Sequence, residues 1–117
     1  MKTIGIVGSR RRNTLNDESL VKDKFFEIYQ EGDQIVSGGC WAGGDKFAEN
    51  IARDNDIDII IHKADWARHG RIAGFLRNTT IAEDCDVLIA CVSEDRTGGT
   101  EDTIKKAVKL GKKIILV

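Results

Sequence analysis

The chain has 117 residues, a length that suits one compact domain whose core forms without a metal or a disulfide. Hydrophobic residues make up 41% and charged residues 32%, and the formal net charge is -1 with a pI near 6.1. These values argue against disorder, against a membrane-spanning segment and against a protein that mainly coats a nucleic-acid backbone. We expect a single domain over residues 1–117, located in the cytoplasm because no signal-peptide pattern begins the chain.

The cysteines do not form a metal-binding or disulfide pattern. Cys40, Cys85 and Cys91 are an odd number, contain no CxxC pair and have no histidine at metal-ligand spacing. We therefore expect reduced thiols, no metal site and no required cofactor.

Five short runs rich in β-branched residues predict strands. In chain order they cover residues 3–7, 34–37, 57–61, 87–92 and 113–117. The runs show little polar alternation, which is typical of strands that are covered on both faces.

Apolar residues with helical spacing separate these runs and predict helices, each with one stripe facing a sheet. The four stripes are Val21, Phe25, Ile28 and Tyr29; Phe47, Ala48, Ile51 and Ala52; Ile72, Phe75, Leu76 and Thr79; and Ile104, Ala107 and Val108. Expected helix starts are at Asp17, Asp45 and Thr100, and expected ends are near Gly32 and Gly111.

The alternation of strands and helices predicts an α/β fold. Right-handed crossovers give a Rossmann-like three-layer α/β/α domain with a five-stranded parallel sheet in the order 3-2-1-4-5. Ligands of such sheets bind beyond the carboxyl ends of the strands, near the point where the strand order reverses. The loops after the first four strands are therefore the candidate site.

The first two of these loops carry arginines and glycines. Gly8, Ser9 and Arg10 follow the first strand directly, whereas Arg11 and Arg12 fit a phosphate contact or a solvated turn equally well. The second loop places four glycines in nine residues, a pattern that favours close approach of backbone N–H groups to an anion. The candidate residues in it are Ser37, Gly38, Gly39, Gly43, Gly44 and Asp45. Neither loop contains a Walker A or a GxGxxG motif.

The third connection and the helix after it supply polar and aromatic candidates. They are Asp65, Trp66, Gly74, Arg77 and Asn78. The Trp66 indole fits two roles equally well, stacking on a base or covering the core.

The fourth loop is again rich in glycine before a helix. Gly98, Gly99 and Thr100 lead into Glu101 and Asp102, which suit either a well-capped helix start or contacts to ribose hydroxyls.

Arginine gathers in these connections while lysine does not. Six of the eight arginines lie there, compared with one of the ten lysines, Lys63, and the planar guanidinium suits anion recognition. We read this segregation as a sign of a site. The six are Arg10, Arg11, Arg12, Arg68, Arg71 and Arg96.

These motifs together resemble the SLOG superfamily, a Rossmann-like group that includes the DNA-uptake protein DprA and the Lonely guy phosphoribohydrolases, and within it the YspA-like branch. The residues that carry the resemblance are 8–10, 37–39, 43–45, 48–49, 64–66, 73–74, 77–78, 86, 98–100 and 102–103. The resemblance implies binding of a small-molecule nucleotide or nucleotide-derived ligand and allows a homodimer.

Lonely guy enzymes carry a PGGxGTxxE motif whose glutamate takes part in cleaving an N-glycosidic bond. Here Thr103 stands at that position and the chain has no proline, so the resemblance favours binding over that reaction. The ligand classes we expect are a nucleoside monophosphate and an NAD- or ADP-ribose-like molecule.

The alternative function is hydrolysis of a nucleoside 5′-monophosphate at its N-glycosidic bond. The candidate catalytic residues are then Asp45, Glu101 or Asp102 as the acid, with Arg77 on the phosphate. Single-stranded DNA binding, as in DprA, fits poorly with 6% aromatic residues and a pI near 6.1.

Overall fold

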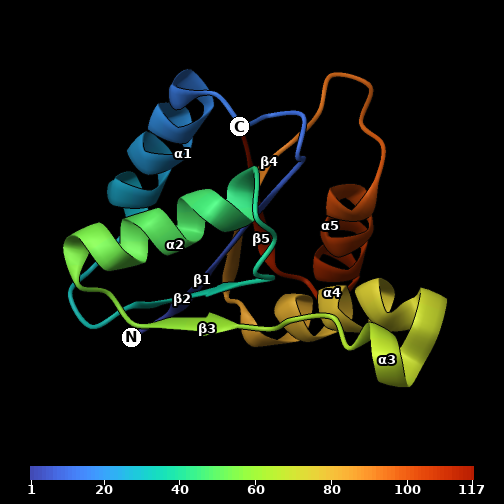
Figure 1. Ribbon diagram of the computed structural model, residues 1–117. Helices are drawn as coiled ribbons and strands as arrows, with labels where there is room; N and C mark the ends of the chain where they lie inside the picture. The colour runs from blue at the N-terminus through green and yellow to red at the C-terminus, as the bar shows by residue number, and fades with distance from the viewer.

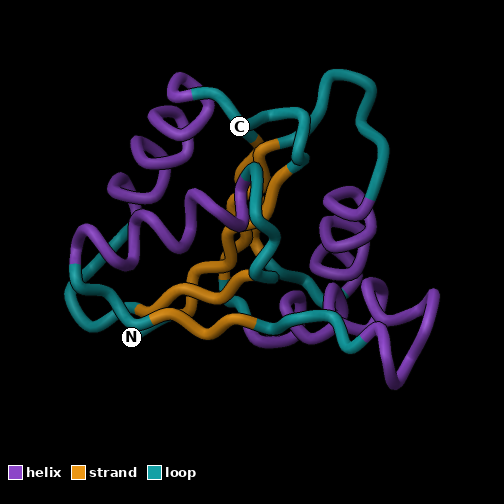
Figure 2. The backbone as a smooth tube through the Cα atoms, in the orientation of Figure 1, coloured by secondary structure: helices purple, strands orange, loops and turns teal.

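A five-stranded, all-parallel sheet lies between two layers of helices in the computed structural model, which describes residues 1–117 (Figure 1, Figure 2). The strand order β3-β2-β1-β4-β5 confirms the predicted α/β fold and topology. The strands are β1 (Thr3–Gly8), β2 (Gln34–Ser37), β3 (Ile59–Ile61), β4 (Val87–Cys91) and β5 (Lys113–Leu116). In register, Ile4 lies beside Val87 of β4, and Thr3 lies beside Gln34 of β2.

The helices divide between the two faces of the sheet. The helices α1 (Leu15–Ile28) and α2 (Gly44–Asn55) cover one face, and α4 (Ala73–Asp84) and α5 (Gly99–Lys109) cover the other (Figure 1). Two short elements precede α4, namely α3 (Trp66–His69) and the 3-10 turn Gly70–Ile72.

Two buried clusters follow from this arrangement. On one face Ile4 and Ile6 pack with Phe25 of α1, and on the other face Val7 and Leu88 pack with Ile81 of α4. Successive residues of one buried strand thus pack alternately against the two helix layers. Both faces of the strand are apolar for this reason, and its sequence shows no polar alternation.

The third strand is shorter than predicted at its start. Ile57 is buried, and its N–H donates to Ala52 O at 2.9 Å, so this residue closes α2. Asp56 before it adopts a left-handed conformation with φ 55°, which ends the helix. Ile57 therefore packs as part of a helix C-cap.

The helix starts fall within one turn of the predicted positions, but the caps are other residues. Thr14 caps α1 and forms a capping box with Asp17, while Gly43 and Gly98 are the N-caps of α2 and α5. Gly111 follows the C-cap of α5 with positive φ, as predicted, whereas α1 ends earlier than predicted, at Ile28, and Gly32 lies with positive φ in the turn before β2.

The stripe predicted for α4 was wrong. Ile72, Phe75 and Leu76 are 55%, 54% and 42% exposed, whereas the buried face of the helix carries Ala73 and Ile81. The helix is turned so that the small residue Ala73 approaches the sheet. The buried Asn78 amide donates to Gly99 O at the start of α5. Val108, predicted to face the sheet from α5, is also exposed.

None of the helices combines the length and the apolar character that crossing a bilayer requires.

The buried carboxylate of Asp33, which is hydrogen-bonded to Lys2, predicts a contribution to stability that is lost in acid. Burial acts to raise the pKa of Asp33, but hydrogen bonds from Lys2 Nζ, Lys2 N and Gln30 N outweigh it and lower the pKa to about 2. Because the folded pKa lies below the unfolded value, the contribution is present above pH 4 and is lost as the pH falls toward 2. We expect Asp33→Asn to lower the free energy of unfolding by about 1–2 kcal/mol at pH 7 and much less at pH 2. Urea unfolding at both pH values measures the difference, and an equal loss at both would contradict it.

Candidate functional site

A cavity of about 670 Å³ opens at the carboxyl edge of the sheet, where the strand order reverses between β1 and β4. The loops after β1, β2, β3 and β4 all contribute to its wall, as the topology predicts. Most of the predicted ligand-binding residues line it, namely Gly8, Ser9, Arg10, Gly38, Gly39, Asp45, Trp66, Arg77, Asn78, Gly98, Gly99 and Thr100.

Five predicted ligand-binding residues lie outside this lining. Asp65 caps α3 by accepting from Arg68 N at 3.1 Å, and Ser37 is fully buried beneath the cavity. Gly43 packs against the backbone of the first loop and Gly44 against the backbone at the end of β1, and Gly74 lies beside Trp66. These residues shape the site from behind its wall.

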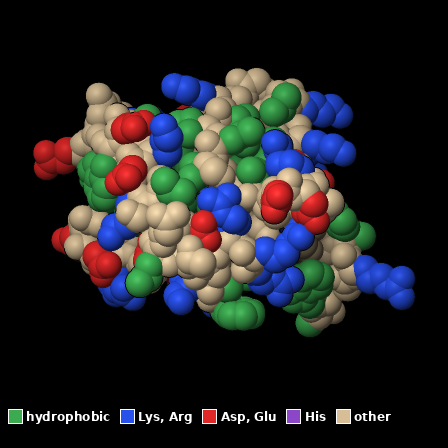
Figure 3. Space-filling view, turned by 90° about the horizontal axis from the view of Figure 1, so that it is seen from above, with side chains coloured by type: hydrophobic (Ala, Val, Ile, Leu, Met, Phe, Trp, Pro, Cys, Tyr) green, Lys and Arg blue, Asp and Glu red, His purple; other side chains and the backbone are tan.

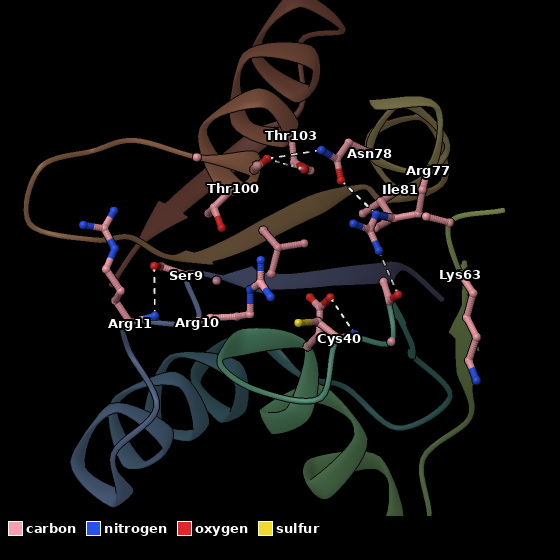
Figure 4. A pocket seen from close by; sticks show the side chains of 18 of the residues that line it. Ser9, Arg10, Arg11, Cys40, Lys63, Arg77, Asn78, Ile81, Thr100 and Thr103 are labelled. Atoms are coloured by element: carbon pink, nitrogen blue, oxygen red, sulfur yellow. Dashed lines mark hydrogen bonds between the residues drawn. The ribbon is translucent and has the colours of Figure 1, made fainter. Parts of the chain in front are cut away.

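Arg10 is the arginine that remains available to a ligand. Its side chain lines the cavity and forms no hydrogen bond or ion pair with the protein, and it extends toward the side on which Cys40 lies (Figure 4). A guanidinium in this position can bind a planar anion through two parallel hydrogen bonds.

Arg11 and Arg12 hold loops together. Arg11 donates to both oxygens of Asp95 at 2.8 Å and to Thr97 Oγ1 at 2.9 Å, so it ties the loop after β1 to the loop after β4. The hydrogen bonds and charge of Arg11 hold the pKa of Asp95 well below its usual range. Arg12 bonds Asp17 and the carbonyl oxygens of two distant segments.

The interpretation of the arginine distribution is therefore only partly right. Of the six arginines in the connections, Arg10 and Arg11 line the cavity. Arg96 pairs with Glu101 at 2.8 Å, and Arg68 and Arg71 are exposed outside the lining. In these loops Arg11, Arg12 and Arg96 join segments of the protein to one another, and Arg10 is left free at the cavity wall.

Arg77 and Asn78 link three sides of the cavity. Arg77 Nη1 donates to Gly38 O at 2.9 Å, and its Nε donates to Asn78 Oδ1 at 3.0 Å. Asn78 Nδ2 donates to Gly99 O at 3.2 Å and to Asp102 Oδ2 at 3.1 Å. Figure 4 shows this chain of bonds running from the second loop across α4 to the start of α5.

The acids at the start of α5 do not reach the cavity. Glu101 is held by Arg96, and Asp102 is bonded by Asn78 and by Lys106 Nζ at 2.8 Å. Thr103, at the position where the resembling hydrolases have glutamate, lines the cavity wall and donates to Gly99 O at 3.3 Å.

Asp45 is the single acidic residue in the lining, which also contains the basic side chains of Arg10, Arg11, Lys63 and Arg77. The residue is 7% exposed, and its carboxyl group accepts from Cys40 N at 3.1 Å. Burial raises its pKa against the lowering effects of the Cys40 backbone hydrogen bond and of the Arg77 charge. The cavity therefore favours an anion.

Figure 3 views the molecule from above and shows Lys and Arg side chains spread over that face, with acidic side chains beside several of them.

Trp66 does not cover the core, because its side chain is 60% exposed. The indole lies at the cavity wall beside Gly74, where an added Cβ would come within 3.3 Å of Cη2. The missing side chain at Gly74 thus makes room for an exposed aromatic ring, a surface on which a flat ligand can stack.

Several lining residues were absent from the predicted set, namely Val7, Arg11, Cys40, Lys63, Ala64, Ile81, Thr97 and Thr103. Their position immediately after a strand is a signal that could have found Cys40, Lys63 and Ala64. Val7 and Arg11 lie on either side of the end of β1, and the positions of Ile81, Thr97 and Thr103 depend on how α4, α5 and the loop after β4 fold over the edge. Lys63 lies at the rim, with its amine directed away from Arg77 (Figure 4).

Comparison with protein-family models, curated proteins and solved structures finds no match to this chain. No group of three or more His, Cys, Asp or Glu side chains is arranged to hold a metal ion.

Proposed function

We propose that the protein binds a nucleotide or nucleotide-derived anion, such as a nucleoside monophosphate or an ADP-ribose-like molecule, in the 670 Å³ cavity. The observation that carries the proposal is the unpartnered guanidinium of Arg10 at the wall of a cavity at the sheet's switch point. The volume falls in the range of small-molecule sites, about 300–1,000 Å³. The resemblance to the SLOG superfamily, which we also propose, points to the same ligand class.

The start of α5 is the second anion-binding element in this proposal. Gly98 caps the helix without a side-chain hydrogen bond, and although Glu101 N donates to Gly98 O, the N–H groups of Gly99 and Thr100 are left for a ligand. The Thr100 hydroxyl points into the cavity from this turn (Figure 4). A phosphate between Arg10 and Thr100 would receive a charged fork, backbone donors and a hydroxyl donor.

Trp66 supplies the subsite for the base. It lines the same cavity as Arg10 and Thr100 and is largely exposed, so a base can stack on it while the phosphate lies at α5. Stacking on an aromatic ring tolerates any base. We therefore expect ribose 5-phosphate to bind more weakly than AMP.

One observation supports the alternative function, a phosphoribohydrolase. Asp45 places a carboxyl group in the cavity wall, whereas Glu101 and Asp102 are engaged elsewhere. If cleavage occurs, Asp45 is the acid and Arg77 the phosphate contact. Incubation with AMP, followed by chromatography for adenine and ribose 5-phosphate, tests the hydrolase function. That function would be rejected if AMP stayed intact after prolonged incubation.

A thermal-shift series with AMP, ADP-ribose and NAD tests the binding proposal. A ligand at 100 times its dissociation constant should stabilise the protein by about 2.7 kcal/mol. The absence of a shift with every nucleotide at millimolar concentration would overturn the proposal.

Cys40 gives an independent readout at the same site. It lines the cavity and is partly exposed, while Cys85 and Cys91 are buried. Bound nucleotide should slow alkylation of Cys40 by N-ethylmaleimide, and inorganic sulfate at equal ionic strength is the control.

The resemblance also allows a homodimer, which stays a prediction.

A further inference from the structure

A buried serine hydroxyl in the site contacts two oxygen atoms but has only one proton. Ser37 Oγ lies 2.6 Å from the backbone oxygen of Ile6 and 3.0 Å from Asp45 Oδ1. A carbonyl oxygen accepts and never donates, so the short contact with Ile6 requires the serine proton. No serine proton is then left for Asp45.

The remaining contact is a hydrogen bond only if Asp45 donates it. An ionised carboxylate has no proton, and two facing lone pairs 3.0 Å apart in a buried setting would repel. A protonated carboxyl satisfies every partner, because Oδ1–H donates to Ser37 Oγ while Oδ2 accepts from Cys40 N at 3.1 Å.

We propose that Asp45 carries a proton in the empty cavity and serves there as a neutral hydrogen-bond donor that lets an anionic ligand lie beside it.

Asp45 has no cation within ion-pair distance, and the nearby Arg77 charge only partly offsets the effect of burial on its pKa. Arg77 Nη1 donates to Gly38 O, and Arg77 and Asp45 approach each other across the space that a Gly38 side chain would fill, where an added Cβ would lie 2.7 Å from Arg77 Nη1 and 2.8 Å from Asp45 Oδ2. Burial raises the pKa of the Asp45 carboxyl, and the like charge of Glu49 one turn along α2 acts in the same direction. The titratable and charged groups that act on it are Glu49, Cys40 and Arg77, and those that share the cavity wall with it are Arg10, Arg11 and Lys63.

The protonation state determines which ligands the cavity can accept. The neutral acid presents no negative charge, so the cavity wall is purely cationic toward a phosphate or a carboxylate. This consequence rests on the proposed function, whereas the protonation state itself does not. Because an anion nearby favours the protonated form, ligand affinity should be constant below the Asp45 pKa and fall by up to about tenfold per pH unit above it.

Carbon-13 NMR of the side-chain carboxyls, recorded on the empty protein, tests the protonation state directly. The Asp45 signal, assigned by its loss in Asp45→Asn, should titrate with a midpoint clearly above the ordinary aspartate value of about 3.9. A midpoint at or below that value would overturn the proposal. This experiment uses no ligand, so its failure is distinct from a failure of nucleotide binding.

A second experiment, with ligand, tests the coupling. The affinity for ADP-ribose is measured by calorimetry between about pH 5 and pH 8, a range in which the pyrophosphate of the ligand does not titrate. The wild type should lose affinity as the pH rises, and Asp45→Asn, whose amide also donates to Ser37, should remove that pH dependence. Glu49→Gln is the matched control, since it neutralises a carboxylate on the same helix and should keep the slope. Equal slopes in the wild type and in Asp45→Asn would overturn the coupling.

Discussion

Replacing Gly44 by alanine is expected to remove a large part of the stability of the fold. Gly44 is the first residue of α2, and a Cβ there would overlap the backbone of Val7 and Gly8 at the end of β1. Backbone atoms of a central strand cannot move aside as the tip of a side chain can. We expect a loss of at least about 3 kcal/mol in the free energy of unfolding, a large part of a typical total of 5–15 kcal/mol.

Gly99→Ala is the matched control. Gly99 is likewise the first residue of a helix and likewise follows a glycine N-cap, but its nearest neighbour to an added Cβ is Asn78 Nδ2 at 3.8 Å, an ordinary contact. The two substitutions have the same chemistry and the same helical position. Urea denaturation should show little change, or a slight gain, for Gly99→Ala. Equal effects for the two variants would show that the overlap at Gly44 is not the cause.

The fold was predictable because its signals are local and agree with one another. Buried strands such as residues 87–91 are continuous apolar runs, and the helices between them force parallel pairing. The handedness rule then leaves the observed order. Besides the short elements before α4, the differences lie at element ends, as at Thr14, which caps α1 through two hydrogen bonds with Asp17, and at Ile57, whose N–H donates to Ala52 O.

The face of α4 was not predictable from hydrophobic spacing. Phe75 and Leu76 sit on the exposed side, and the Lys106 ammonium lies 5.5 Å from the Phe75 ring centroid and donates to Phe75 O. The buried side includes Asn78, which a pattern of apolar residues reads as solvent-facing. Its orientation depends on carbonyl and carboxyl acceptors of α5, more than twenty residues away.

The location of the cavity was predictable from topology, but the contacts that each arginine makes were not. Arg11 and Arg10 are neighbours in sequence, and only the fold shows that Asp95 lies opposite one of them. In the same way, four glycines in the second loop indicated ligand contact, yet Gly43 and Gly44 are required by the close approach of two backbones. Sequence proximity does not distinguish a residue in the wall from one behind it.

Arg10→Ala is expected to weaken nucleotide binding by about 10- to 100-fold, because each hydrogen bond to a charged group contributes about 1.5–3 kcal/mol. The guanidinium has no protein partner, so the free energy of unfolding should stay the same. Arg10→Lys keeps the charge but lacks the planar guanidinium, so its affinity for the nucleotide should lie between those of the wild type and Arg10→Ala. Arg71→Ala, which removes an exposed arginine outside the cavity lining, is the control for net charge. Calorimetric titration with AMP at fixed ionic strength measures all four proteins, and the phosphate contact assigned to Arg10 would be rejected if Arg10→Ala and Arg71→Ala bound AMP equally well.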